Sequence, residues 1–390
     1  MKRSTNTIAL AAITVILSLI TIDRMLAKLD MSQGKNTLTR LCLLTFLLLF
    51  VVLYNKRTTV SNGLRKTSIC FLLFTIPSML FSTTGINVLY GWIAVLFVPL
   101  GILVGKHTCK ICCASSKPDR MLGLIILPAI IGSLWILLMS GTLDLFNLGR
   151  DYIFSVVVFV PLLFYFKSPV LKYGTLILVL YVVVLSTKRT ALIAIGSATV
   201  VYLLANIQEI KRVNIKSAFS AVFFSICIVF AVQSLYSGTV KDAFDVTVER
   251  MSNLEDKSNE AREDIYTQVY SKIEASPVSS IAFGHGYNGV TKDLFGHPAH
   301  NDYLEIIYDY GVFAVFFYVL ILLGLLNLYL RQGVRFSKNP HVAIVLVTFV
   351  ILNSANCIIT NASYVYVCMF CIGWALEYTN LNNKENGRLS

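Results

Sequence analysis

Charged side chains are scarce in this chain of 390 residues. Only 14% of the residues are Asp, Glu, Lys or Arg, whereas 56% are hydrophobic and the mean hydropathy is +0.71. A soluble domain could not hide so much apolar surface inside one core. The composition therefore excludes a soluble globular protein and predicts an all-α integral membrane protein with many spans.

Cysteine is absent between Tyr236 and Gly311, which excludes a disulfide framework in that segment. Most of the nine cysteines lie in apolar runs, where a free thiol behaves as a small hydrophobic group. The run from His107 to Cys113 has metal-like spacing, but a structural zinc site usually needs a second such group. We interpret this run as a cytoplasmic juxtamembrane loop and predict no metal.

Apolar runs long enough to cross a membrane recur along the chain. We count about twelve, at residues 8–22, 41–54, 68–81, 88–104, 121–140, 152–166, 173–186, 191–205, 218–235, 311–330, 341–358 and 363–378. Lys2 and Arg3 precede the first run as in a signal peptide, but no small-residue cleavage site follows it. We therefore expect this helix to be retained.

The basic residues indicate the orientation, because Lys and Arg next to the spans stay on the cytoplasmic side. With both termini in the cytoplasm, the basic clusters at 56–66, 106–120, 167–172, 211–216 and 331–338 all fall inside. Segment 241–309 then lies outside, with six basic and thirteen acidic residues. The net charge of +12 therefore indicates topology and contact with membrane lipids, not nucleic acid.

The spans divide the chain into three parts: residues 1–235 with nine helices, the outer loop 236–301, and residues 302–390 with three helices and a cytoplasmic tail. The loop is too long for an idle connection in a compact bundle. We expect amphipathic helices at 248–257 and 261–275.

The second of these helices has a clear apolar face. Ile265, Val269 and Ile273 fall on one side of it, acidic residues occupy its first turn, and Pro277 ends it.

Three of the five histidines, His285, His297 and His300, lie in the polar segment before the tenth span. Polar chemistry at the head of a membrane helix is where binding or a reaction is expected. Asn301 can cap this helix, and the helix dipole would favour an anion there. Taken alone, His300 is more simply read as a satisfied polar cap.

Glycines precede these residues, at Gly284, Gly286 and Gly289. They permit backbone conformations that other residues resist, and the pattern is more typical of a plain loop than of a phosphate site.

Helical spacing places Asp302, Glu305 and Asp309 on one face. The simpler interpretation of these carboxylates is a solvated turn at the membrane interface. The alternative is a partner that orients His300 or a contact to an acceptor sugar.

Three arginines fall on the outer side against the topological trend, namely Arg150, Arg189 and Arg262. Each could have a structural role. Several outer guanidinium groups together with a histidine favour a lipid substrate that carries phosphate, because guanidinium matches phosphate oxygens bidentately.

The pattern His300-Asn301, nine residues, then Gly311 resembles the signature of bacterial O-antigen ligases and O-antigen polymerases. These are integral membrane glycosyltransferases of the GT-C type. Ser186-Thr-Lys-Arg189 resembles the start of a mid-chain span of this family. Arg262 followed by Gly284-His-Gly286 is similar to its outer loop, so that the resemblance covers about residues 186–330.

The resemblance implies transfer of a glycan from an undecaprenyl-diphosphate carrier, without cofactor, nucleotide sugar or metal, at the periplasmic face of the inner membrane. A flippase and a chain-length regulator are the implied partners. His300 would accept the acceptor's hydroxyl proton or hold the diphosphate. The predicted site residues are, for catalysis, His300, Arg189 and Arg262, and for substrate binding, Arg150, Asn301, Gly284, Gly286 and Glu305.

Two acceptors are open within this resemblance. A polymerase extends another lipid-linked repeat unit, whereas a ligase transfers the glycan to lipid A-core. Ala314 stands where ligases commonly have Gly, which with the modest outer loop favours polymerase. A lipid-glycan flippase is a further alternative, although such transporters carry ionisable residues near mid-membrane and these spans have almost none.

Overall fold

The computed structural model describes residues 62–81, 85–127, 130, 153–185, 188–206, 257–294, 298–331, 340–355 and 362–385. All regular secondary structure in these ranges is helical, as the composition predicts. The labelled helices are α3 (Asn62–Phe81), α4 (Gly85–Cys113), α7 (Ile153–Val157), α8 (Val160–Leu163), α9 (Pro169–Leu185), α10 (Arg189–Ala205), α14 (Lys257–Glu274), α15 (Val278–Phe283), α16 (Gly289–Asp293), α17 (Asp302–Arg331), α18 (His341–Ala355) and α19 (Ala362–Glu385). Residues 118–127 are helical as well.

Two of the described helices are long and apolar enough to cross a membrane, by length and composition. They comprise Ile93–Cys113 of α4 and Asp302–Asn327 of α17. Shorter apolar helices occupy Lys66–Ser78, Pro169–Val184, Arg189–Ala205 and His341–Ser354. The predicted spans 8–22, 41–54 and 218–235, most of 121–140, and most of the predicted helix 248–257 lie outside the described residues.

Helices α4 and α19 pack with their backbones in direct contact. A Cβ on Gly105 would collide with the backbone of Phe370, and a Cβ on Gly373 would collide with the carbonyl of Ile102. Small residues are typical of such close helix pairs in membranes, where dispersion contacts replace the hydrophobic driving force.

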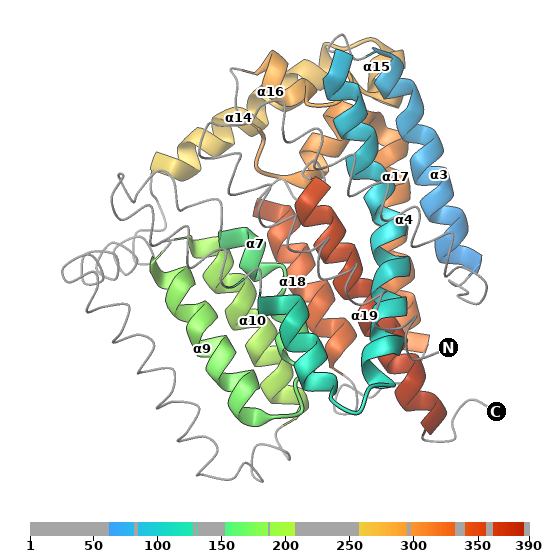
Figure 1. Cartoon of the computed structure of the whole chain (residues 1–390). Helices are drawn as coiled ribbons and strands as arrows, with labels where there is room; N and C mark the ends of the chain where they lie inside the picture. Colours follow the sequence, from blue (N-terminus) through green and yellow to red (C-terminus); the bar gives the residue numbers. More distant parts are fainter. Residues whose placement is uncertain are drawn as a thin grey trace.

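Helix α17 packs against α3 through aromatic side chains. The rings of Phe74 and Phe317 stack with centroids 5.0 Å apart, and those of Phe71 and Tyr318 lie 6.0 Å apart. Beyond the N-terminal end of α17, the helices α14, α15 and α16 gather at one end of the bundle (Figure 1). These three helices and the first turns of α17 form the predicted site region.

The structure differs from the sequence expectation at two places. The predicted span 152–166 is divided into α7 and α8 by a turn at Val158 and Phe159, because Pro161 in the first turn of α8 has no N–H to continue the helix. The run from His107 to Cys113, predicted as a loop, forms the last turns of α4 instead. In the described ranges, no group of three His, Cys, Asp or Glu side chains is placed to hold a metal ion.

Candidate active site

The site region is built on a kink in α17. Gly311 lies inside this helix with φ 86° and ψ 173°, which interrupts the helical backbone between its polar head and its apolar body. Gly284 in the loop after α15 has nearly the same conformation, with φ 81° and ψ 179°. Both values are accessible to glycine at little cost and strained for other residues.

The glycine loop docks onto this kink through its backbone. The N–H of His285 donates to the carbonyl of Tyr308 at 2.9 Å, and the N–H of Gly286 donates to the carbonyl of Asp309 at 3.0 Å. A kink leaves carbonyls without their helical donors, and here the loop supplies those donors. The structural role of Gly284 and Gly286 is therefore attachment of the loop to the helix.

His285 is held on both sides of its ring. Its Nδ1–H donates to the carbonyl of Tyr308 at 3.1 Å, and its Nε2 lies 2.8 Å from the hydroxyl oxygen of Ser276. The ring also stacks on that of Tyr308 with centroids 4.2 Å apart. This histidine therefore serves to fasten the loop, a role that its sequence position did not reveal.

Asp309 holds the next part of the loop. Its two carboxylate oxygens accept the backbone N–H of Asn288 at 2.7 Å and that of Val290 at 3.1 Å. Asp309 is fully buried. A buried carboxylate needs such donors, since burial of an unpaired charge is very unfavourable. The solvated-turn interpretation of the carboxylate face is therefore wrong, because Asp302 and Glu305 are buried as well.

Glu305 positions the residue that precedes His300. Its Oε1 accepts the backbone N–H of Ala299, which is itself fully buried. On the other side of His300, the Oδ1 of Asn301 accepts the N–H groups of Tyr303 at 3.0 Å and Leu304 at 3.3 Å. The predicted helix cap is confirmed.

His300 therefore stands between two anchored neighbours. Its own backbone has φ 54°, a left-handed conformation that is uncommon for a residue with a side chain. Such a conformation persists only where the surroundings impose it, and it is often found at functional sites. The side chain of His300 is partly exposed, whereas Glu305, whose carboxylate holds the neighbouring Ala299, is buried.

A small apolar core supports this arrangement. Val269 of α14 is fully buried against a cluster that includes Val290 and Leu304, and Ile265 and Ile273 pack beside it. The predicted apolar face of this helix is confirmed. Helix α14 ends at Glu274, and Pro277 precedes α15, so that the predicted end at Pro277 holds within a few residues.

The predicted arginines have different positions. Arg189 is partly buried at the first turn of α10. Helices α9 and α10 are antiparallel, with Lys172 near the start of α9 bonded to Tyr202 near the end of α10, so that Arg189 lies at the other end of this pair. That end faces α14 in Figure 1.

Arg262 belongs to the first turns of α14. The side chain of Arg262, and Arg150 and His297, lie outside the described residues.

The structure thus brings five predicted residues together at the head of α17, namely His300, Asn301, Glu305, Gly284 and Gly286. Sequence reasoning did not identify Asp309 as the loop anchor, nor Tyr308 as the platform for His285. Helical spacing did place Asp309 on the same face as Glu305. This shared helix face was the feature of the sequence from which a buried set of carboxylates could have been predicted.

Comparison with known proteins gives one finding for this region. Residues 174–319 match the sequence model of a protein family described as O-antigen ligase. The match includes α10, α14 and the head of α17, and therefore contains Arg189, Arg262 and His300. A search of curated proteins gives no match.

Proposed function

We propose that this chain, whose residues 174–319 match the O-antigen ligase family, is an O-antigen polymerase. In this role the chain would act within the membrane in lipopolysaccharide biosynthesis, which the match to the O-antigen ligase family supports. In the proposed reaction, it transfers a glycan from an undecaprenyl-diphosphate carrier to another lipid-linked repeat unit. The reaction takes place at the periplasmic face of the bacterial inner membrane.

The observation that carries the proposal is the placement of His300. Its backbone is fixed in a left-handed conformation between Ala299, which Glu305 holds, and Asn301, which caps α17. A partly exposed imidazole on a rigid support fits a group that must meet a substrate in one defined orientation. A mere helix cap would need only Asn301.

The proposed chemistry is a single displacement at the anomeric carbon of the donor. The hydroxyl oxygen of the acceptor sugar forms the new bond to this carbon, and the bond from the carbon to the diphosphate oxygen breaks. The hydroxyl proton passes to the imidazole of His300, which acts as the base. Undecaprenyl diphosphate leaves with the bonding electron pair.

Arg189 and Arg262 are proposed to stabilise the negative charge that grows on the leaving diphosphate. Guanidinium groups form bidentate hydrogen bonds with phosphate oxygens, and electrostatic stabilisation of this kind commonly contributes most to the acceleration of such transfers. Arg150 and Asn301 would contact the substrate beside them. No cofactor enters this scheme.

Buried Ala314 supports the polymerase over the ligase, because ligases commonly have Gly at the corresponding position. The outer loop 236–301 is also modest in length for a protein that must accept lipid A-core. A deletion strain tests the choice on a lipopolysaccharide gel. Loss of a polymerase leaves core carrying one repeat unit, whereas loss of a ligase leaves bare core. If the deletion strain shows core without any repeat unit, the polymerase proposal is wrong and ligase activity takes its place.

Loss of a lipid-glycan flippase would also leave bare core, and it is distinguished from loss of a ligase by retention of the lipid-linked repeat units on the cytoplasmic side. A chain-length regulator and a flippase are the proposed functional partners of the polymerase, since its donor must reach the periplasmic face and its product has a controlled length.

A further inference from the structure

A cavity of about 280 Å³ lies at the end of the bundle opposite to the candidate active site. It is bounded by the last turn of α4, the loop that follows, and the C-terminal half of α19, and Figure 1 shows that this end of α4 points away from α14 and α16. Its lining includes Lys110, Tyr165, Lys167 and Trp374. None of these residues takes part in the proposed transfer.

Two buried polar atoms of residues that line this cavity have no hydrogen-bond partner among the residues that the structure describes. They are the hydroxyl oxygen of Tyr165 and the indole nitrogen Nε1 of Trp374. Tyr165 is 7% exposed and Trp374 is 2% exposed. Buried polar groups nearly always have partners, and an indole N–H can only donate. The missing partner of Trp374 must therefore be a hydrogen-bond acceptor.

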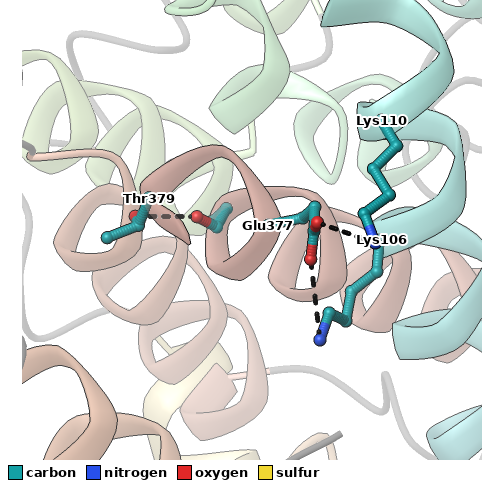
Figure 2. Close-up of polar contacts among 5 residues, drawn as sticks. Lys106, Lys110, Glu377 and Thr379 are labelled. Atoms are coloured by element: carbon teal, nitrogen blue, oxygen red, sulfur yellow. Dashed lines mark hydrogen bonds and ion pairs between the residues drawn. The ribbon is translucent and has the colours of Figure 1, made fainter. Parts of the chain in front are cut away.

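The charges around the cavity favour a negatively charged acceptor. Glu377 of α19 forms ion pairs with Lys106 at 3.6 Å and with Lys110 at 3.3 Å, as Figure 2 shows. One carboxylate thus faces two ammonium groups, which leaves an excess of one positive charge. Lys167 adds a second positive charge in the lining, and no acidic side chain lines this cavity among the described residues.

An apolar groove of about 670 Å³ adjoins the cavity, and the two share Pro118 and Lys167 in their linings. The apolar lining of the groove includes Ile126, Phe166 and Leu171.

The rim of this groove is basic. Lys117 and Arg120 are exposed there, together with Lys167. Asp119 also lines the groove, but both its carboxylate oxygens are occupied, since they accept the backbone N–H of Lys167 and that of Ser168 at 2.8 Å each. The groove therefore combines an apolar floor with a net positive rim.

We propose that this cavity and groove together bind one anionic phospholipid of the surrounding membrane. Its phosphate lies in the cavity beside Lys110 and Lys167 and accepts the N–H of Trp374 and the hydroxyl of Tyr165. One acyl chain lies in the apolar groove. A soluble phosphate would satisfy the cavity but leave the groove empty, which is why the lipid is the occupant that fits both. Basic pockets between membrane helices are known to take anionic headgroups.

Native mass spectrometry of the full chain in detergent tests the site, with phosphatidylglycerol and phosphatidylcholine as the two probes. We expect saturable binding of phosphatidylglycerol that is stronger than that of phosphatidylcholine. Trp374→Phe removes only the indole N–H and keeps most of the ring volume, whereas Lys167→Gln removes a charge. Each should weaken binding of phosphatidylglycerol by about tenfold.

Lys272→Gln in the exposed part of α14 is the matched control for loss of one positive charge, and its binding should equal that of the unaltered chain. Circular dichroism should show that all variants keep their helix content. If Lys167→Gln does not fold, Trp374→Phe decides. Equal binding of the two lipids, unaltered binding in Trp374→Phe, or displacement of the lipid by millimolar inorganic phosphate would each overturn the proposal.

Discussion

The α-carbon of Gly284 lies against the backbone just before Gly311, and the α-carbon of Gly311 lies against the backbone just before Gly284. A Cβ on Gly284 would collide with the carbonyl of Asp309, and a Cβ on Gly311 would collide with the carbonyl of Ala282. Both residues also have positive φ. The glycine loop and the kink of α17 are therefore complementary surfaces, and the position of each depends on the absence of a side chain from the other.

Alanine at either position should destabilise the protein by several kcal/mol, since the left-handed backbone alone costs roughly 1–2 kcal/mol and the backbone collision adds to it. Thermal unfolding in detergent measures the effect. Gly196→Ala in α10 is the control, because a Cβ there meets nothing within 4 Å and should be neutral or slightly stabilising. Equal melting temperatures for Gly284→Ala and Gly196→Ala would show that the close contact is not required.

Local patterns were the part of this site that the sequence could predict. Asn301 precedes an apolar run, which identified it as a cap, and the helical spacing of Ile265, Val269 and Ile273 identified the face of α14 that packs inward. Each depends on residues within a few positions of one another. Pro161 could likewise have predicted the break between α7 and α8, but the uninterrupted apolar run was given more weight.

Long-range contacts could not be predicted in this way. The burial of Asp309 depends on backbone donors from Asn288 and Val290, about twenty positions earlier in the chain. A carboxylate on a helix near the membrane interface has no local feature that distinguishes this role from a solvated one. The same holds for His285, which lies in the loop after α15, whereas its partner Tyr308 lies in α17.

Asp309→Asn should loosen the glycine loop. The substitution keeps one oxygen acceptor but removes the charge and replaces the other acceptor with a donor that faces a backbone N–H. The expected loss of stability is about 1.5–3 kcal/mol for each charged hydrogen bond that is lost. Thermal unfolding measures it, and limited proteolysis between α15 and α16 should become faster.

Asp293→Asn is the matched control for this change. Asp293 is exposed, and its carboxylate accepts the hydroxyl of Tyr308 at 3.0 Å. Its replacement should cost at most about 1 kcal/mol, as is usual for exposed polar contacts. A similar loss in both variants would mean that the charge of Asp309 is not what holds the loop.

Arg189→Lys and Arg262→Lys test the proposed grip on the diphosphate. Lysine keeps the charge but lacks the planar fork, so each variant should lose transfer corresponding to about 1.5–3 kcal/mol for a lost charged hydrogen bond. The measurement is the length and intensity of glycan ladders, normalised to the amount of protein in the membrane. Arg120→Lys, at the opposite end of the bundle, should give ladders like those of the unaltered chain. Full activity in both test variants would remove the arginines from the mechanism.

The orientation of the bundle can be tested with fused reporters. A periplasmic reporter fused after Gly286 should be active, and a cytoplasmic reporter fused after Lys338 should be active. The reason is that clusters of basic residues keep the loops that contain them on the cytoplasmic side of the membrane. Alkaline phosphatase and green fluorescent protein give opposite signals in the two compartments. The reversed pattern would place the candidate active site in the cytoplasm and would contradict the proposed transfer.

His300 and His285 provide the sharpest separation of catalysis from structure, because they lie in the same loop region and differ in what they contact. His285→Ala removes the bond to the Tyr308 carbonyl, the contact with Ser276 and a stacked ring. It should therefore lower the melting temperature, and its loss of ladders should follow the loss of folded protein. His300→Ala leaves the anchors at Ala299 and Asn301 in place, since both use groups other than the imidazole.

His300→Ala should therefore fold to a normal amount and lower transfer by about 10²–10⁴, the usual effect of removing a proton acceptor. Histidine is more frequent than alanine in the left-handed region, so the substitution adds a small backbone cost, which the melting temperature reports. The rate per folded molecule in reconstituted vesicles, measured with a lipid-linked repeat unit, distinguishes the two histidines. The catalytic assignment fails if His300→Ala retains its rate per folded molecule, or if its melting temperature falls as far as that of His285→Ala.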